Sequence, residues 1–232
     1  MILWILLILI VILVIIKFRY KIKIKWKSFF HKGVKCNDSK FGVYCYHGKQ
    51  GSTKTASCVK FILEQHDNLG YDVYANIKSL KGIEYYYFNG LEGLLSLRDK
   101  SKCIIFFDEI FTLLTKSSRM TNDILDFLSQ MRKREIIFIT TAQEWLEINM
   151  TLRRYCKYEI KCSKINLPFF ALSLKTFGNA EQMKWSQEEN EYLCPTICLT
   201  LEKLNKKYLN LYDTFEQINS SVTIYPTKTY NK

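Results

Sequence analysis

The feature that most constrains the fold is the segment Gly48-Lys-Gln-Gly-Ser-Thr-Lys-Thr55, which lies between an apolar run and a helical pattern. A loop of this kind wraps a phosphate chain with successive backbone N–H groups, at a helix N-terminus that attracts negative charge. Its lysine reaches the β- and γ-phosphates, and its last hydroxyl is offered to Mg²⁺. The sequence therefore predicts a nucleotide-binding loop made of Gly48, Lys49, Gln50, Gly51, Ser52, Thr53, Lys54 and Thr55.

This loop departs from the usual pattern G-x-x-x-x-G-K-[ST] at one position. Thr53 stands where the second glycine is expected, and Gly51 supplies flexibility inside the loop instead. Lys54 and Thr55 keep the places that serve the phosphates and the metal ion. Taken alone, such a turn is also typical of an ordinary connection between a strand and a helix. The other motifs of the chain therefore decide between this interpretation and a phosphate loop.

The remaining pattern predicts an α/β fold with a mainly parallel central sheet flanked by helices. Cys103–Phe107 is apolar throughout, as expected for a strand that is buried on both faces of a parallel sheet. Asn122–Arg132 has apolar residues at helical spacing and leads to another apolar run, as a crossover helix does. Strands are predicted at Phe41–His47, Tyr71–Ile77, Ile83–Phe88, Cys103–Phe107, Glu135–Thr141, Tyr158–Ile165, Ala171–Phe177 and Leu209–Tyr212. Helices are predicted at Lys54–Asn68, Leu91–Asp99 and Asn122–Arg132, and residues 181–206 are expected to be mainly polar and partly helical.

Two acids follow the buried strand Cys103–Phe107 directly. Carboxylates at that position are costly unless they meet a cation or water, and ligands bind at the carboxyl edge of a parallel sheet. Asp108 is therefore expected to hold Mg²⁺ together with Thr55, and Glu109 to polarise the attacking water. Gln143 follows the next strand at the same edge, where an amide can orient that water. The alternative interpretation makes the two acids a solvated strand end.

Taken in order, these motifs resemble those of the zonula occludens toxin-like (Zot-like) ATPases and the viral DNA-packaging ATPases of the FtsK/HerA superfamily. The resemblance covers roughly residues 40–217 and implies a P-loop NTPase with ATP and Mg²⁺ as cofactors. It also implies a homo-oligomeric ring that moves viral DNA during packaging, or during virion extrusion with coat or assembly proteins. It rests on Gly48–Thr55, Asp108-Glu109, Gln130-Met-Arg-Lys-Arg134, Thr140-Thr-Ala-Gln143 and Leu152-Arg-Arg154.

Rings of this type use an arginine of the neighbouring subunit to stabilise charge that develops on the γ-phosphate. Arg119 and Arg132 are the favoured candidates for this role. The other candidates are Arg134, Arg153 and Arg154, and any of the five can instead be a solvated residue or a contact to a phosphate backbone.

The N-terminal residues predict a membrane anchor. Residues 1–16 are uninterruptedly apolar, and six Lys/Arg alternate with apolar residues over positions 17–27. Positive charge on the C-terminal flank places that side in the cytoplasm, so we expect a single span of the inner membrane with a cytoplasmic ATPase domain. Residues 1–40 carry +8 of the formal net charge of +12. The basic run then serves either topology and anionic lipid or, as the alternative, contact with DNA.

We expect four regions: a transmembrane anchor at 1–20, a basic tether at 21–40, the ATPase domain at 41–217 and a C-terminal tail at 218–232. The expected function is a phage or prophage ATPase that couples ATP hydrolysis to DNA packaging or virion extrusion. Two alternatives stay open, a non-hydrolysing adaptor that keeps nucleotide binding as a switch and a host motor for DNA transfer. A hydrophobic content of 48% is enough for a packed core and excludes a disordered chain.

Overall fold

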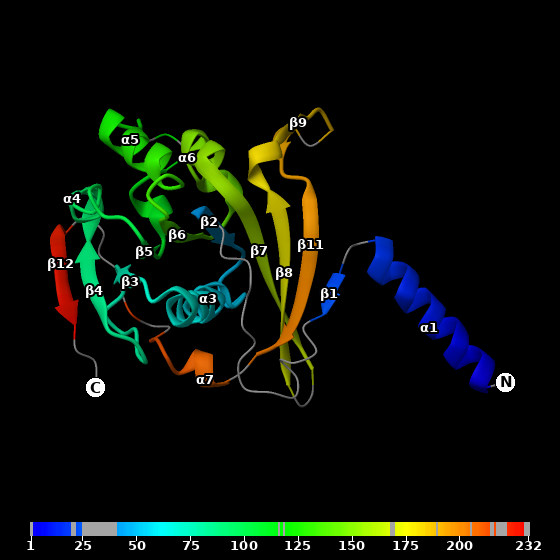
Figure 1. The fold of residues 1–232 in the computed structure, drawn as a ribbon. Coiled ribbons are helices and arrows are strands. Elements are labelled where there is room, and N and C mark those ends of the chain that lie inside the picture. The colour runs from blue at the N-terminus through cyan, green and yellow to red at the C-terminus, as the bar shows by residue number, and fades with distance from the viewer. Residues whose placement is uncertain are drawn as a thin grey trace.

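The computed structural model describes residues 2–19, 22–24, 41–115, 117, 119–167, 170–188, 190–204, 206–213, 216 and 222–229. Its centre is a 10-stranded sheet with the order β1-β11-β8-β7-β2-β6-β5-β3-β4-β12 (Figure 1). The sheet has a parallel half, which follows the predicted α/β pattern, and a half that is largely antiparallel. The two halves join at the pair β2 and β7.

The parallel half contains the strands that the apolar runs predict. The strand β6 lies between β2 and β5, so the chain leaves the sheet centre and returns to it through crossover helices. The buried residues of β5 alternate between the two faces, because Ile105 and Phe107 pack in one core cluster and Ile104 and Phe106 in the other. These strands are β2 (Gly42–His47), β3 (Asp72–Ala75), β4 (Tyr85–Asn89), β5 (Cys103–Phe107) and β6 (Ile137–Ala142).

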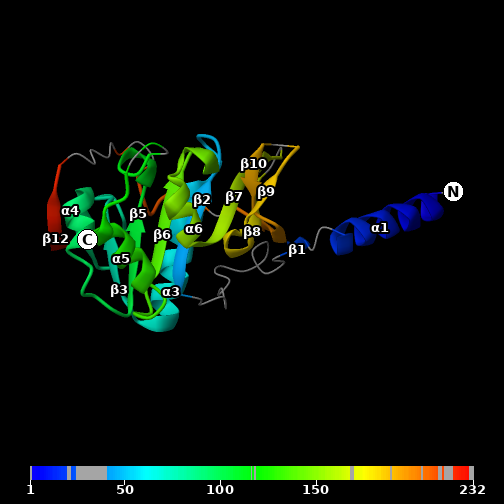
Figure 2. The ribbon, with the colours of Figure 1, turned by 90° about the horizontal axis from the view of Figure 1, so that it is seen from above.

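Helices cover both faces of the parallel half, as Figure 2 shows from above. The long helix α3 (Lys54–Leu69) buries Cys58, Val59 and Ile62 against one face. On the other face, the apolar side chains of three helices pack together in the second cluster. These are α4 (Gly90–Leu95), α5 (Asn122–Gln130) and α6 (Met150–Tyr155). Short 3-10 helices lie at Ile110–Thr112, Trp145–Glu147 and Ala180–Gln182.

The other half extends the sheet beyond β2. The strands β7 (Cys156–Asn166), β8 (Ala171–Asn179) and β11 (Thr196–Lys203) form an antiparallel ribbon, which we call the β-extension. The short strand β1 (Ile22–Ile24) pairs with β11, and β9 (Lys184–Ser186) pairs with β10 (Glu191–Leu193) in a separate hairpin. Near the other end of the chain, β12 (Ile224–Thr229) pairs with β4, so the sheet reaches into the segment expected to be a tail.

Two secondary-structure predictions were wrong. Residues 181–206 hold three strands instead of helix, and the strand predicted at Leu209–Tyr212 is the end of helix α7 (Lys206–Leu209) and a turn. The strand β11 was missed because its buried face carries Cys198, Thr200 and Glu202 in place of aliphatic residues. A polar buried face hides the apolar alternation by which a strand is recognised.

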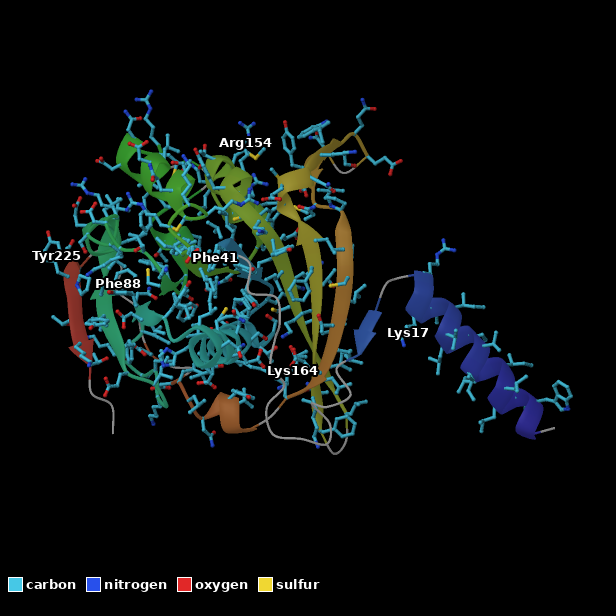
Figure 3. All side chains as sticks on the ribbon, viewed as in Figure 1. Lys17, Phe41, Phe88, Arg154, Lys164 and Tyr225 are labelled. Carbon is cyan, nitrogen blue, oxygen red and sulfur yellow. The ribbon has the colours of Figure 1, made fainter. Side chains whose placement is uncertain are left out.

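The first helix, α1 (Ile2–Arg19), projects away from the sheet (Figures 1 and 2). Its large apolar side chains from Trp4 to Ile16 are 39% to 70% exposed, and Figure 3 shows them standing clear of the rest of the chain. In the part of the chain that is described, no helix is long and apolar enough to cross a membrane. The structure therefore gives no support to the predicted transmembrane helix at 1–20, and most of the predicted tether lies outside the described residues.

Candidate nucleotide-binding site

The predicted phosphate loop connects β2 to α3. Gly48 has a φ of 144°, and a Cβ at this position would overlap the backbone carbonyl oxygen of Cys162 on β7. Its N–H donates a hydrogen bond of 3.0 Å to the carbonyl oxygen of Gln143, which follows β6. The start of the loop is thus fixed between the two neighbours of β2, and only glycine fits there.

The end of the loop forms the first turn of α3. Thr53 adopts a left-handed conformation, with φ 72° and ψ 21°, and α3 begins at Lys54. The ammonium group of Lys54 donates hydrogen bonds to the carbonyl oxygens of Gly48 at 2.5 Å and Lys49 at 3.2 Å. The lysine therefore folds back over the loop that it is predicted to serve. Ser52 Oγ is buried in this loop and has no hydrogen-bond partner in the described structure, as expected of a group that faces a ligand.

Asp108 meets the loop from the end of β5. The hydroxyl groups of Thr141 and Thr55 hydrogen-bond to its carboxylate, which joins the strand end to the first turn of α3. Burial raises the pKa of Asp108 to about 6, although these hydrogen bonds and the charge of Lys54 favour the carboxylate. The structure thus brings together Lys54, Thr55 and Asp108, although more than 50 positions separate the acid from the loop in the sequence.

Two polar residues that fix Asp108 and Glu109 were missed as site residues. Asn76 is 1% exposed, its Nδ2 donates to the carbonyl oxygen of Asp108 at 3.0 Å, and its Oδ1 accepts from the Asp108 N–H at 2.6 Å. Thr141 donates its hydroxyl to Asp108 and accepts a hydrogen bond of 2.8 Å from the Glu109 N–H. Asn76 follows β3 and Thr141 lies in β6, the two neighbours of β5. A polar residue at the end of each neighbouring strand was the signal that could have found them.

Glu109 and Gln143 lie at the same carboxyl edge as the loop. Glu109 is half-buried and has a φ of 57°, a left-handed conformation that turns the chain directly after β5. Gln143 is exposed and contacts the loop through the backbone hydrogen bond from Gly48. The predicted juxtaposition of the two residues with the loop is therefore present, while their roles toward water stay predictions.

The residues that were predicted to hold Mg²⁺ fit that ion. Mg²⁺ prefers oxygen ligands and is usually held by one or two protein groups together with substrate phosphates and water. Thr55 and Asp108 supply a hydroxyl and a carboxylate in hydrogen-bond contact with each other. Among the described residues, no cluster of three or more His, Cys, Asp or Glu could hold a metal ion by itself.

A cavity of about 830 Å³ opens beside the loop, on its β7 side. The loop and Gln143 form one wall, and the hairpin strand β10 with Tyr192 lies on another. On the cavity floor His47 Nε2 lies 2.8 Å from Glu159 Oε1. Asp108 and Glu109 lie on the other side of the loop, toward β5. Lys54, Thr55 and the two acids do not line this cavity, which borders the loop on its other side.

The candidate arginines are not gathered at this site. Arg119 is exposed and lies between the 3-10 helix Ile110–Thr112 and α5. Arg132 is exposed at the opposite edge of the sheet, just before β6, and its guanidinium lies 3.1 Å from Glu181. Arg154 is exposed and Arg134 is half-buried. Arg153 is only 5% exposed and packs over the ring of Trp145, so it is the least accessible of the five candidates to another subunit.

Comparison with known proteins bears on this geometry. The N-terminal domain of zonular occludens toxin from Neisseria meningitidis has a similar fold, with 15% identity over 74% of this chain and 98% of that domain and a TM-score of 0.54. The genome packaging NTPase B204 from Sulfolobus turreted icosahedral virus 2 aligns over 68% of this chain and 97% of its own, with 10% identity and a TM-score of 0.47. No curated protein matches the sequence. The similarity to the zonular occludens toxin domain confirms, at the level of the fold, the resemblance that the motifs predicted.

The sequence profile of the ATPase family associated with various cellular activities (AAA) matches residues 44–164. This range is just over half of the chain and runs from β2 to β7. It contains the phosphate loop, the acid pair after β5 and Gln143. The chain belongs to the ATPase family associated with various cellular activities (AAA).

Proposed function

We propose that this chain binds ATP with Mg²⁺ at the loop between β2 and α3 and hydrolyses it. The observation that supports this most strongly is the meeting of Lys54, Thr55 and Asp108 at one sheet edge, with Glu109 as the next residue. Backbone N–H groups of the loop and the Lys54 ammonium would bind the phosphates, while Thr55 and Asp108 would hold Mg²⁺. The bound ion supplies charge stabilisation at the phosphates when it is present.

In this proposal Glu109 accepts a proton from the attacking water, and Gln143 orients that water. Thr141 and Asn76 fix the backbone around the two acids, so the Glu109 side chain starts from a defined position. A carboxylate at the end of a buried strand can receive the proton only if it faces the γ-phosphate. The left-handed backbone conformation of Glu109 sets the direction in which its side chain leaves the backbone.

ATP hydrolysis by the full chain, kept in solution with a mild detergent, tests this function. Glu109→Gln should retain ATP binding and lose turnover at least 100-fold, because a positioned base contributes about 10²–10⁴-fold. Lys54→Ala should weaken ATP binding itself. Glu84→Gln, at an exposed pair on β4's flank, is a matched control that should change neither. Turnover by Glu109→Gln at the normal rate would contradict the assignment of the base, and ATP binding without hydrolysis by the wild type would support the adaptor alternative.

We further propose that the ATPase acts as an oligomeric ring that moves viral DNA in a phage or prophage, during packaging or virion extrusion. The motif resemblance supports this, and Arg119, a favoured candidate for the arginine that reaches a neighbouring subunit, is exposed, whereas Arg153 is buried. Stimulation of ATP hydrolysis by DNA, measured for single-stranded and double-stranded DNA separately, is the test. Equal rates with and without DNA, in protein shown to be oligomeric, would contradict the motor.

Attachment to the cytoplasmic side of the inner membrane is the last part of the proposal. The apolar side chains of α1 support it, because a helix with its large residues 39% to 70% exposed lowers its free energy when lipid covers it. The full chain should float with vesicles that contain anionic lipid, whereas a chain without residues 1–19 should not. Equal flotation of both would contradict attachment through α1.

A further inference from the structure

Thr53 adopts a backbone conformation that threonine rarely takes. Its φ of 72° and ψ of 21° are left-handed, and a β-branched residue in this region is an outlier. Thr53 immediately precedes Lys54, and its carbonyl oxygen accepts the hydrogen bond of 3.0 Å from the Ser57 N–H that opens α3. The conformation of this one residue therefore sets both the end of the phosphate loop and the direction in which the helix starts.

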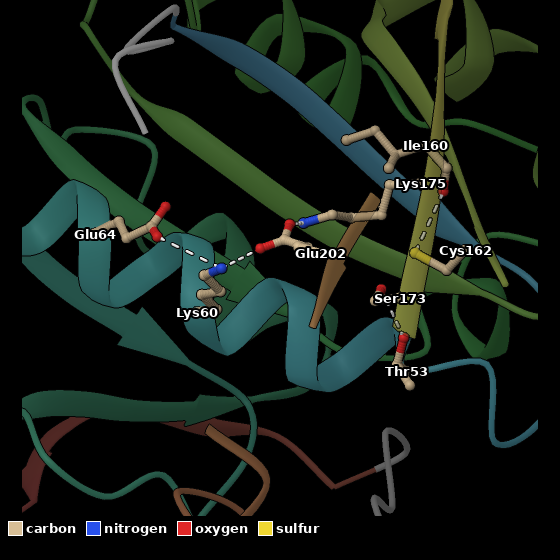
Figure 4. Close-up of polar contacts among 8 residues, drawn as sticks. All are labelled: Thr53, Lys60, Glu64, Ile160, Cys162, Ser173, Lys175 and Glu202. Carbon is tan, nitrogen blue, oxygen red and sulfur yellow. Dashed lines mark hydrogen bonds and ion pairs between the residues drawn. The ribbon is translucent and has the colours of Figure 1, made fainter. Parts of the chain in front are cut away.

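The Thr53 side chain does not cap its own helix. Its hydroxyl lies 3.1 Å from the hydroxyl of Ser173, and either group can donate the hydrogen bond (Figure 4). Ser173 belongs to β8 and is 3% exposed, so this contact joins the loop to a strand 120 positions away. A partly buried hydrogen bond of this kind helps to hold a strained residue in a conformation that it would otherwise leave.

The strand that carries Ser173 is itself held against α3. Lys175, two residues along β8 and on the same face, forms an ion pair with Glu202 of β11, and Glu202 also pairs with Lys60 of α3 (Figure 4). The Lys60 ammonium lies 3.9 Å from Glu64 one turn further along the helix. The β-extension therefore contacts the start of α3 and again about two turns later, which fixes Ser173 relative to the loop.

We propose that Ser173 is a positioning residue for nucleotide binding, acting through Thr53. Its hydroxyl replaces what glycine supplies in the usual loop, namely a left-handed residue before the lysine. This inference rests on the proposed ATP-binding function. The β-extension then helps to shape the phosphate loop, although no residue of the β-extension belongs to that loop.

The proposal predicts a dependence between two positions. Glycine adopts left-handed backbone conformations about as readily as right-handed ones. A loop that carries the substitution Thr53→Gly therefore needs no hydrogen-bond partner on β8 to hold position 53. Ser173→Ala should therefore weaken ATP binding in the wild type and have no effect when Thr53→Gly is also present. If Ser173 only stabilised the fold, Ser173→Ala would have the same effect on ATP binding in the wild type and in the Thr53→Gly background.

The experiment uses four full-length chains: the wild type, Ser173→Ala, Thr53→Gly and the double variant. ATP dissociation constants and the KM and kcat of hydrolysis are measured for each. We expect Ser173→Ala to raise Kd and KM about fivefold, the effect of losing one hydrogen bond, with kcat nearly unchanged. Thr53→Gly and the double variant should have equal Kd values, because Ser173 has no role once position 53 is glycine.

Two further variants keep the test decisive if Ser173→Ala does not fold. Thr53→Ser keeps the hydroxyl and Thr53→Ala removes it, so Thr53→Ala should bind ATP about fivefold more weakly than Thr53→Ser. Thr176→Val, on the opposite face of β8, is the control for a lost hydroxyl on that strand and should leave Kd unchanged. Thermal unfolding of each variant checks that the fold is retained.

Three results would overturn the proposal. Ser173→Ala and Thr53→Ala could both leave Kd unchanged, or Ser173→Ala could weaken binding equally in the wild type and in the Thr53→Gly background. In either case the wild type still binds ATP, so the proposed function stands and only the role of Ser173 fails. Absence of ATP binding by the folded wild type would overturn the proposed function and this inference together.

Discussion

The ion cluster between α3 and the β-extension allows a quantitative test of how the two halves of the sheet are joined. Glu202 carries the negative charge of the cluster, and its side chain is 3% exposed, against 8% for Lys175 and 12% for Lys60. Burial lowers the pKa of Lys175, but the charge and hydrogen bond of Glu202 outweigh this and raise it above its ordinary value. Glu202→Gln keeps the shape of the side chain and removes the carboxylate that pairs with the buried Lys175, while Lys60 keeps Glu64 at 3.9 Å.

The expected loss is about 3–5 kcal/mol in the free energy of unfolding, because breaking a buried pair leaves an uncompensated buried charge. That is a large part of the roughly 5–15 kcal/mol that stabilises an ordinary domain. Urea denaturation at neutral pH, followed by circular dichroism, measures the loss as a lower midpoint with an unchanged slope. Glu181→Gln is the matched control, because the pair of Glu181 and Arg132 is 49% and 68% exposed and should contribute about 0–1 kcal/mol.

A second substitution separates the buried charge from lost packing. Lys175→Met combined with Glu202→Leu replaces the pair by apolar side chains of similar volume, and should recover most of the stability that Glu202→Gln loses. If Glu202→Gln cost no more than Glu181→Gln, water would reach the cluster and the reasoning from its burial would be refuted.

Three other predictions follow from the site. The pKa of Asp108 in the folded state, about 6, lies above its ordinary value of 3.8, so the folded state holds the proton of this carboxyl group more tightly than the unfolded state does. The stability that this proton contributes is therefore lost as pH rises from about 4 to about 6. Asp108→Asn should flatten the dependence of stability on pH over that range and abolish Mg²⁺-dependent hydrolysis. Gly48→Ala should abolish ATP binding in a dialysis assay, because its Cβ would overlap a backbone carbonyl, whereas Gly51→Ala has open space and should cost about 1 kcal/mol of stability for its left-handed backbone. Arg119→Ala alone should lose hydrolysis, and mixing it with Glu109→Gln subunits should restore part of the rate if Arg119 acts across subunits, because a mixed interface pairs an intact Glu109 with an intact Arg119; Arg132→Ala, which loses only an exposed ion pair, should keep its rate without mixing.

The sequence by itself determined the local units of this protein. The strand, loop and helix around Gly48–Thr55 follow from short-range patterns, as does the buried strand that ends at Asp108. Such patterns are readable because an apolar run, a glycine turn and a helical period each depend on residues that are close in the chain. The order of the motifs also placed Lys54, Thr55, Asp108 and Gln143 at one sheet edge, since carboxyl ends of parallel strands meet there.

Only the tertiary structure decided which distant residues complete the site. The position of Asn76 at the end of a strand is a signal in the sequence, but its hydrogen bonds to the backbone of Asp108 appear only once β3 lies beside β5. Nothing near Ser173 in the sequence indicates its contact with Thr53. The strand β11 was hidden because Glu202 and Thr200 on its buried face are polar, and the cost of burying Glu202 is offset by lysines from other elements. Arg153 looked like an exposed cation and is packed over Trp145. Each of these depends on contacts between segments far apart in the chain, and such contacts exist only once packing has fixed the sheet order.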